Sequence, residues 1–235
     1  MKWEDIYSTR ITPEKEIEMG RVLLTYDEAE VFAEGTMSVV SGGAKSKKTF
    51  ALSLLVEQLL TPSEPGFTST FAGEVLWFDT EMSERRVQMV SKRFTEPQRI
   101  TFIPIRQYSI RERYEIIEEG IKQLRPELVV IDGYKELVLD INDGPYATRL
   151  TNKLLQWTTE YQCHITGVLH TNPESRKPRG ALGTELMNKA ALTAFVEAKG
   201  PKSMISTLLS RDKEIPNIVF GINDEGKPII QTPFY

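Results

Sequence analysis

The stretch Ser41-Gly-Gly-Ala-Lys-Ser-Lys-Lys-Thr49 decides the fold that we expect of this chain. It follows a short apolar run at residues 37–40 and opens a largely apolar run at residues 49–60. The first run is typical of a strand, and the second is typical of a helix buried against a sheet. A turn of small residues between a strand and a helix gathers backbone N–H groups at the positive end of the helix, where an anion is stabilised. We therefore expect a phosphate-binding turn here.

This stretch follows the P-loop pattern G-x-x-x-x-G-K-[ST] from Gly42 to Thr49, with Lys47 in place of the second glycine. That glycine tolerates a backbone geometry that a side chain disfavours, so the loop either strains or takes a variant path. In a P-loop the lysine, here Lys48, reaches the β- and γ-phosphates, and the hydroxyl of Thr49 binds Mg²⁺. A chance polar turn with three lysines is the alternative. The residues expected to contact the nucleotide are Gly42, Gly43, Ala44, Lys45, Ser46, Lys47, Lys48, Thr49 and Phe50.

Composition is that of an ordinary globular protein, with 235 residues, 40% hydrophobic and 26% charged. We expect one ATPase-sized α/β domain at residues 36–235, preceded by an irregular lead-in at residues 1–35. No run approaches the ~18 apolar residues of a membrane span, and the first residues lack the apolar region of a signal peptide. The single Cys163 excludes an internal disulfide, so we expect a cytoplasmic protein. The net charge of −4 argues against a surface that coats nucleic acid everywhere, but it allows a local basic loop.

Strand-like and helix-like segments alternate as far as residue 170, which predicts a mostly parallel, twisted sheet with helices on both faces. Strands are expected at 74–79, 100–105, 128–132 and 165–170, with helices at 84–94, 110–124 and 145–161. From residue 192 onward the pattern predicts an antiparallel extension of four strands, at 192–198, 203–210, 216–222 and 228–231. Ligands bind such sheets beyond the carboxyl ends of the strands. This fold would bring Gly42, Glu81, Asp132 and His170 to one edge.

Three of these polar residues follow strands and suit a reaction of phosphates. Asp132 ends a run of four aliphatic residues and could bind Mg²⁺ beside Thr49, although an acid there could also be a turn residue. Glu81 could orient the water that attacks the γ-phosphate; otherwise it is a helix N-terminal charge, or Asp79 is the active acid. His170 could sense the γ-phosphate and transmit its presence to the following loop, or it could be a structural partner.

Two further groups of basic residues could act on phosphates. The loop that contains Arg176, Lys177 and Arg179 suits the backbone of single-stranded nucleic acid, but it has no aromatic residue on which bases could stack. A solvated loop is the alternative. Arg211 could serve as an arginine finger that reaches across a subunit interface to stabilise charge on the transferring phosphoryl group. A surface charge pair with Asp212 is the alternative.

The order of these segments resembles the RecA-like ATPases, over about residues 30–225. The resemblance is to the branch that contains the hexameric plasmid helicase RepA, which is related to DnaB and RadA. It rests on the P-loop, on Glu81-Met82, on Val-Val-Ile-Asp132, on Leu169-His170-Thr171-Asn172 and on Arg179-Gly-Ala-Leu-Gly183.

This resemblance implies a motor that hydrolyses ATP with Mg²⁺ on single-stranded DNA, as a homo-oligomeric, hexameric ring. The strand that ends at His170 would lie between two other strands. One of these precedes the P-loop turn, and the other ends at Asp132. The loop 171–183 would line a central channel. Arg211 matches the arginine of a Lys-x-Arg finger motif, but Leu209 stands at the lysine position, with Lys213 as a substitute. A recombination or regulatory ATPase of the RadA or KaiC kind, and a nucleotide-binding scaffold with an altered P-loop, are the alternatives.

Overall fold

The computed structural model describes residues 2–17, 20–172 and 175–231. Its strands are β1 (Val22–Tyr26), β2 (Ala29–Ala33), β3 (Met37–Gly42), β4 (Phe67–Ser69), β5 (Val75–Asp79), β6 (Ile100–Pro104), β7 (Leu128–Asp132), β8 (His164–His170), β9 (Leu192–Lys199), β10 (Lys202–Ser210), β11 (Ile218–Ile222) and β12 (Pro228–Ile230). Its helices are α1 (Trp3–Ser8), α2 (Lys48–Leu60), α3 (Glu84–Ser91), α4 (Ile110–Leu124), α5 (Gly144–Tyr161) and α6 (Gly180–Lys189), with short 3₁₀ helices η1 (Pro97–Arg99) and η2 (Tyr134–Leu137).

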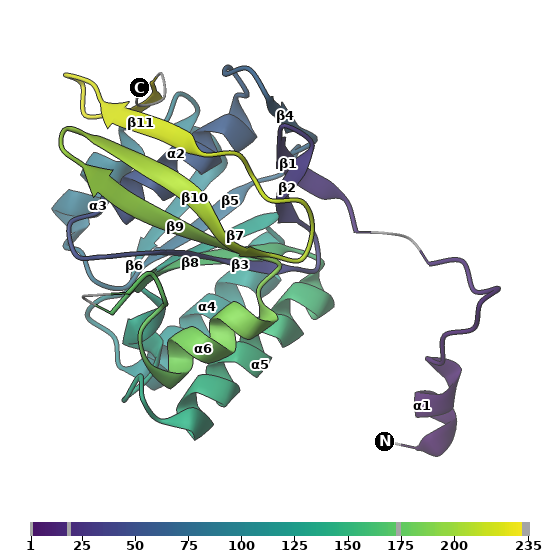
Figure 1. Ribbon diagram of the computed structural model, residues 1–235. Helices are drawn as coiled ribbons and strands as arrows, with labels where there is room; N and C mark the ends of the chain where they lie inside the picture. Colours follow the sequence, from purple (N-terminus) through teal and green to yellow (C-terminus); the bar gives the residue numbers. More distant parts are fainter. Residues whose placement is uncertain (1, 18–19, 173–174, 232–235) are drawn as a thin grey trace.

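A nine-stranded sheet in the order β12-β11-β10-β9-β3-β8-β7-β5-β6 forms the centre of the molecule (Figure 1). Strands β9, β3, β8, β7, β5 and β6 run parallel, whereas β10, β11 and β12 continue the sheet in antiparallel pairs. The predicted fold class, a mostly parallel sheet with an antiparallel extension near the C-terminus, is confirmed. Strand β8 lies between β3 and β7, as the resemblance implied.

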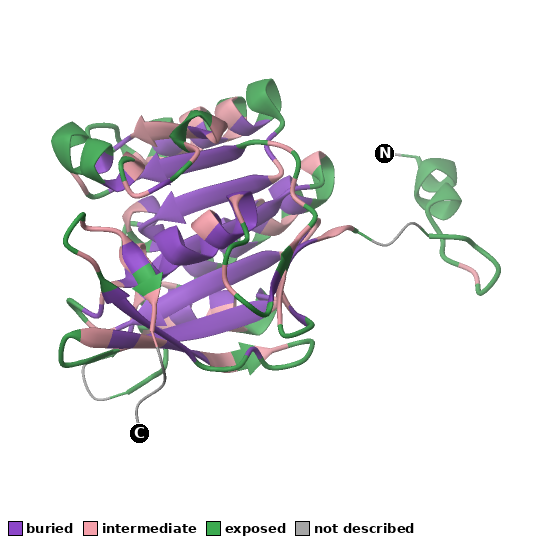
Figure 2. Ribbon diagram, turned by 90° about the horizontal axis from the view of Figure 1, so that it is seen from above, coloured by how far each residue is buried: buried purple, intermediate pink, exposed green. Residues whose placement is uncertain are grey.

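Helices cover both faces of this sheet because its central strands are apolar on both sides. In β5, Trp77 belongs to the hydrophobic cluster under α2 and α3, while its neighbours Leu76 and Phe78 belong to the cluster under α4, α5 and α6. This alternation is the period of two expected of a strand. Figure 2 shows the strands of the sheet buried between outer layers that are more exposed. No helix of the described ranges is both long and apolar enough to cross a membrane.

The first 35 residues differ from the irregular lead-in that we expected. Residues 22–33 form β1 and β2, which join β4 in a three-stranded sheet of order β2-β1-β4. Leu23, Leu24 and Phe32 are buried in the same cluster as α2. The signal was weak because the turn between β1 and β2, Asp27-Glu28, has positive φ without a glycine, and because β4, the other partner of β1, lies more than 40 residues away.

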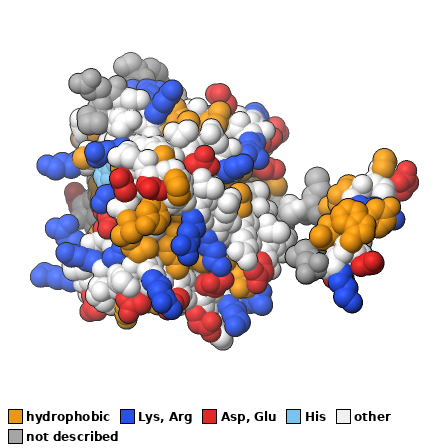
Figure 3. All heavy atoms as spheres, turned by 90° about the horizontal axis from the view of Figure 1, so that it is seen from below, with side chains coloured by type: hydrophobic (Ala, Val, Ile, Leu, Met, Phe, Trp, Pro, Cys, Tyr) orange, Lys and Arg blue, Asp and Glu red, His pale blue; other side chains and the backbone are white. Residues whose placement is uncertain are grey.

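An N-terminal arm, residues 2–17, lies apart from the folded body (Figures 1 and 3). It contains the short helix α1, in which no residue is buried. The arm leaves uncovered a set of large apolar side chains, namely those of Trp3, Ile6, Tyr7, Ile11 and Ile17.

Some boundaries also differ. Helix α6 begins at Gly180, within the loop 171–183 that we expected, and α3 ends at Ser91 rather than at residue 94.

Candidate nucleotide-binding site

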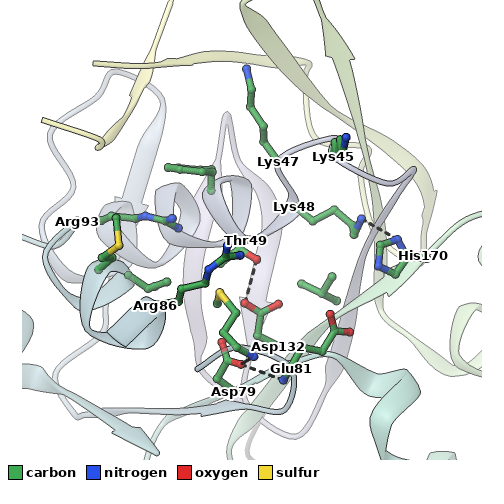
Figure 4. A pocket seen from close by; sticks show the side chains of 15 residues that line it. Lys45, Lys47, Lys48, Thr49, Asp79, Glu81, Arg86, Arg93, Asp132 and His170 are labelled. Carbon is green, nitrogen blue, oxygen red and sulfur yellow. Dashed lines mark hydrogen bonds between the residues drawn. The ribbon is translucent and has the colours of Figure 1, made fainter. Parts of the chain in front are cut away.

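The carboxyl ends of β3, β5, β7 and β8 meet at one edge of the sheet, where they border a cavity of about 610 Å³. Side chains from the sequence-predicted set line it together, namely Lys45, Lys47, Lys48, Thr49, Phe50, Glu81, Asp132 and His170 (Figure 4). Segments that are distant in the sequence meet here because the strands are parallel and neighbouring. The cavity is thus built from the turn after β3 and from the residues that end or follow the other strands.

The turn after β3 keeps a glycine-like backbone although Lys47 replaces glycine. Lys47 has φ +71° and ψ +35°, in the left-handed region, and it immediately precedes α2. This conformation costs a residue with a side chain roughly 1–2 kcal/mol. The Lys47 Nζ donates a hydrogen bond to the carbonyl oxygen of Pro201, 2.7 Å away in the turn between β9 and β10. The loop is therefore strained but retains its path, and the side chain points away from the carboxylates (Figure 4).

Gly42, the first glycine of the P-loop pattern, is retained, and the structure leaves no room for a larger residue there. A Cβ on Gly42 would lie 2.5 Å from the carbonyl oxygen of Val196 and 2.6 Å from the Ser46 Oγ. Both distances are shorter than van der Waals contact, so only glycine allows β9 and the turn to approach each other this closely.

Lys48 is buried and directed into the turn. Its Nζ donates to the carbonyl oxygens of Gly42 (3.1 Å) and Gly43 (2.8 Å) and lies 3.2 Å from His170 Nδ1. Burial lowers the pKa of Lys48 to about 8, against the opposing effect of Glu81 and Asp132. The pKa of His170 is lowered, first by burial and then by nearby Lys48, Lys135 and Arg179. A neutral His170 can accept a hydrogen bond from Lys48 through Nδ1.

Thr49 and Asp132 form the pair that Mg²⁺ would need. The Thr49 Oγ1 donates to Asp132 Oδ2 over 2.9 Å. Burial, and then the nearby Asp79, raise the pKa of Asp132 to about 7, opposed by the hydrogen bond from Thr49. In the described part of the chain, no three His, Cys, Asp or Glu side chains are grouped to hold a metal ion by themselves. One carboxylate and one hydroxyl fit Mg²⁺, which takes its other ligands from phosphates and water.

Asp79 and Glu81 have different positions although both follow β5. Asp79 is buried, and its Oδ1 accepts the N–H groups of Glu81 (3.0 Å) and Met82 (2.6 Å). The second oxygen, Oδ2, is buried without a hydrogen-bond partner. Glu81 is exposed to the cavity, and its pKa is raised, first by desolvation and then by Glu136 and Asp79. The Asp79 carboxylate thus fixes the backbone of the turn from which the Glu81 side chain extends into the cavity.

One wall of the cavity was missed by the sequence analysis. Arg93, just after α3, stacks over the ring of Phe50 at 3.6 Å and donates to the Ser53 Oγ at 3.2 Å. Burial lowers its pKa to about 10, although Asp132 acts in the opposite direction. Arg86, Met89 and Arg93 share this wall at a spacing of three and four residues. That spacing was the one available signal for a common helix face.

A model of the AAA domain matches residues 26–176, which is more than half of the chain. The chain belongs to the AAA-domain family. Its fold is similar to that of a KaiC-like protein from the hyperthermophilic archaeon Pyrococcus horikoshii OT3, with a TM-score of 0.61 and 13% identity over 86% of this chain and 92% of that one. No curated protein matches the sequence. Family and fold together identify a RecA-like P-loop ATPase.

The basic loop of this AAA-domain protein lies beside the cavity. The Arg176 Nη2 lies 3.6 Å from the Glu197 Oε2, and its guanidinium lies over the ring of Phe195 at 5.1 Å. This ring belongs to β9, but it is buried beneath Arg176 and offers no open face on which a base could stack. Lys177 and Arg179 are exposed, and the N–H of Arg179 donates to the carbonyl oxygen of His170 at 2.9 Å. Residues 173–174 of this loop lie outside the described residues.

The structure does not bring Arg211 to the cavity. Ser210 pairs with Leu192, and Leu192 pairs with Ser38 at the beginning of β3, whereas the P-loop follows the end of β3. Arg211 therefore lies at the opposite edge of the sheet, where its Nη2 donates to the carbonyl oxygen of Asn188 at 3.0 Å. Lys213, the suggested substitute, donates to the carbonyl oxygen of Asp27 at 2.9 Å. Neither residue can act on the nucleotide site of its own AAA domain.

Proposed function

We propose that this AAA-domain protein hydrolyses ATP with Mg²⁺ and couples that reaction to movement on single-stranded DNA, as RepA-type motors do. The observation that carries the proposal is the position of His170. Its ring lies 3.2 Å from the Lys48 Nζ, and its carbonyl oxygen holds the N–H of Arg179 in the basic loop. A change at the phosphates would thus be transmitted through one residue to the loop that meets DNA.

Each polar group of the cavity has a role in this reaction. Lys48 and the backbone of the turn would hold the phosphates, with Thr49 and Asp132 beside the metal ion. Magnesium bound with the nucleotide would neutralise the charge that develops on the phosphate oxygens. Glu81, held by the turn at Asp79, would orient the attacking water, and its raised pKa suits proton acceptance.

We further propose that the working form is a homo-oligomeric ring of six copies. Arg211 could supply charge only to another copy, because it lies at the far edge of its own sheet. The uncovered apolar side chains of the N-terminal arm support an association between copies, since an isolated helix as short as α1 is unstable in water.

The similarity to a KaiC-like protein favours a second candidate, an ATPase that binds DNA or protein without unwinding. A strand-displacement assay separates the two. Displacement of a strand from a forked duplex in the presence of ATP supports the motor. DNA-stimulated hydrolysis without displacement supports the second candidate.

The first prediction is that single-stranded DNA accelerates ATP hydrolysis and that Lys48→Ala abolishes hydrolysis, because the loop then loses the cation that reaches the phosphates. Hydrolysis is measured with and without DNA, alongside native mass spectrometry. Lys122→Ala, which removes an exposed lysine of α4, is the matched control and should behave as the parent. An unstimulated rate and a monomeric mass would contradict the motor. A parent without hydrolysis, or an unchanged rate in Lys48→Ala, would indicate a nucleotide-binding scaffold.

A further inference from the structure

A second cavity, of about 630 Å³, adjoins the nucleotide site at the same edge of the sheet. The two cavities share Glu81 and His170, which therefore form the wall between them. In Figure 4 both residues lie on the side of the nucleotide cavity away from Arg86 and Arg93. The lining of the second cavity includes four cationic residues, namely Arg106, Arg113, Lys135 and Arg179.

Arg113 holds together two of the segments that line this second cavity. It is buried, and its guanidinium donates to the carbonyl oxygens of Ile105, Arg106 and Glu136. These bonds join the segment after β6 to η2 after β7. The Arg113 Nη1 also lies 3.8 Å from the Glu136 Oε2, a longer ion pair than the one that Glu136 forms with Lys135.

The other cations are available to an anion. In the described residues, the side chains of Arg106 and Arg179 have no hydrogen-bond or ion-pair partner, and both residues are exposed. Lys135 pairs only with Glu136, at 2.9 Å, and its side chain is 55% exposed. Four cations therefore face two carboxylates, those of Glu81 and Glu136, so the cavity carries a net positive charge.

We propose that this basic cavity binds inorganic phosphate as it leaves the nucleotide site past Glu81 and His170. The inference rests on the proposed hydrolysis of ATP, which transfers the γ-phosphoryl group to water and leaves ADP and phosphate. The product carries negative charge, so a path lined by cations would stabilise it as it leaves. Lys48 lies at one side of the shared wall, and Lys135, Arg106 and Arg179 lie at the other.

The charges around the wall support this path. Lys48 and Lys135 both oppose the rise in the pKa of Glu81, and Lys48, Lys135 and Arg179 all lower the pKa of His170, so cations that line both cavities lie near the shared wall. A phosphate that moved from Lys48 to Lys135 would stay within reach of a cation throughout.

The test is direct binding of inorganic phosphate to the full chain with Lys48→Ala, which removes the lysine of the nucleotide site. Adding Arg106→Ala and Lys135→Ala should weaken this binding by about tenfold or more, because charge-assisted hydrogen bonds are lost. Arg111→Ala, at an α4 position whose side chain is 89% exposed, is the matched control and should leave binding unchanged. No saturable binding in Lys48→Ala, or equal binding with and without the two further changes, overturns the proposal.

A second measurement uses Lys48 intact and follows a single turnover. Arg106→Ala with Lys135→Ala should slow the appearance of free phosphate severalfold behind the cleavage of ATP. Equal rates of cleavage and release in parent and variant overturn the proposal. Absence of ATP hydrolysis in the parent refutes the proposed function but leaves the binding test valid. If Arg106→Ala with Lys135→Ala weakens the affinity for single-stranded DNA but leaves the affinity for phosphate unchanged, the proposal is also overturned. The cavity is then assigned to the DNA backbone.

Discussion

At the scale of single residues, the cavity holds ionisable groups whose pKa values are set by burial rather than by partners. Asp132 is the clearest case, because its pKa of about 7 lies well above the ordinary value of 3.8. The Thr49 hydroxyl compensates for only part of the cost of burying the charge. Nucleotide and metal would supply the missing positive charge, so a site of this kind is less stable without its ligand than with it.

The second prediction follows from Asp132. Between about pH 4 and pH 7 the folded protein holds a proton that the unfolded chain releases, so the free energy of unfolding should fall as the pH rises through this window. The slope for one proton is at most about 1.4 kcal/mol per pH unit. Urea unfolding of ligand-free parent and Asp132→Asn at pH 5 and pH 7 measures it, and the stability advantage of Asp132→Asn should grow with pH.

The buried His164 acts in the opposite direction, because burial lowers its pKa to about 4. The unfolded chain then binds more protons than the folded one below about pH 6, which favours the folded protein as the pH rises. His164 is present in both proteins, so its effect cancels in the comparison. The same pH dependence in parent and Asp132→Asn would show that Asp132 titrates normally.

At the scale of elements, local pattern predicted those segments whose apolar period is set by burial against the central sheet. Helix α4 and strand β7 begin and end as expected, and the antiparallel strands near the C-terminus lie close to their expected ranges. Strands β1 and β2 were missed although they pair locally through the turn at Asp27-Glu28, and β4 was missed because its pairing with β1 is non-local. The wall formed by Arg93 over Phe50 was missed for the same reason, because it depends on how α3 packs beside α2. The sequence showed that Lys47 replaces the second glycine of the P-loop pattern, but it could not predict the backbone conformation of Lys47.

The third prediction concerns the turn between β5 and α3. Asp79→Ala removes the acceptor of the Glu81 and Met82 N–H groups, so Glu81 should lose its fixed position. We expect kcat for ATP to fall about ten- to hundredfold while KM changes little, because the phosphates are bound elsewhere. Asp79→Asn keeps an acceptor oxygen and should lose less. A rise in KM with unchanged kcat would show that the turn serves binding instead.

At the scale of the whole molecule, the two ends of the parallel strands carry different groups of residues. The carboxyl ends of the parallel strands carry the nucleotide cavity and the basic cavity, and the opposite edge carries Arg211. In the proposed ring, Arg211 could therefore act only on the nucleotide site of another copy. The N-terminal arm adds apolar side chains that the described body of the same copy does not cover.

The fourth prediction is that deleting residues 2–17 lowers the assembly state without unfolding the domain. The arm contributes no buried residue of α1 to the core, so the melting temperature of the body should change little. Native mass spectrometry and thermal unfolding measure the two effects. Glu14→Ala in the same arm, a change of charge without loss of apolar surface, is the control. An unchanged assembly after the deletion would show that other surfaces hold the copies together.

The bond between Lys47 and the Pro201 carbonyl has a mechanical consequence. It ties the loop around the phosphates to the tip of a hairpin in the antiparallel half of the sheet. Widening of that loop for exchange of nucleotide would either break this exposed hydrogen bond or move the hairpin with the loop. Loss of the Lys47 hydrogen bond would therefore separate the movement of the phosphate loop from that of the hairpin between β9 and β10.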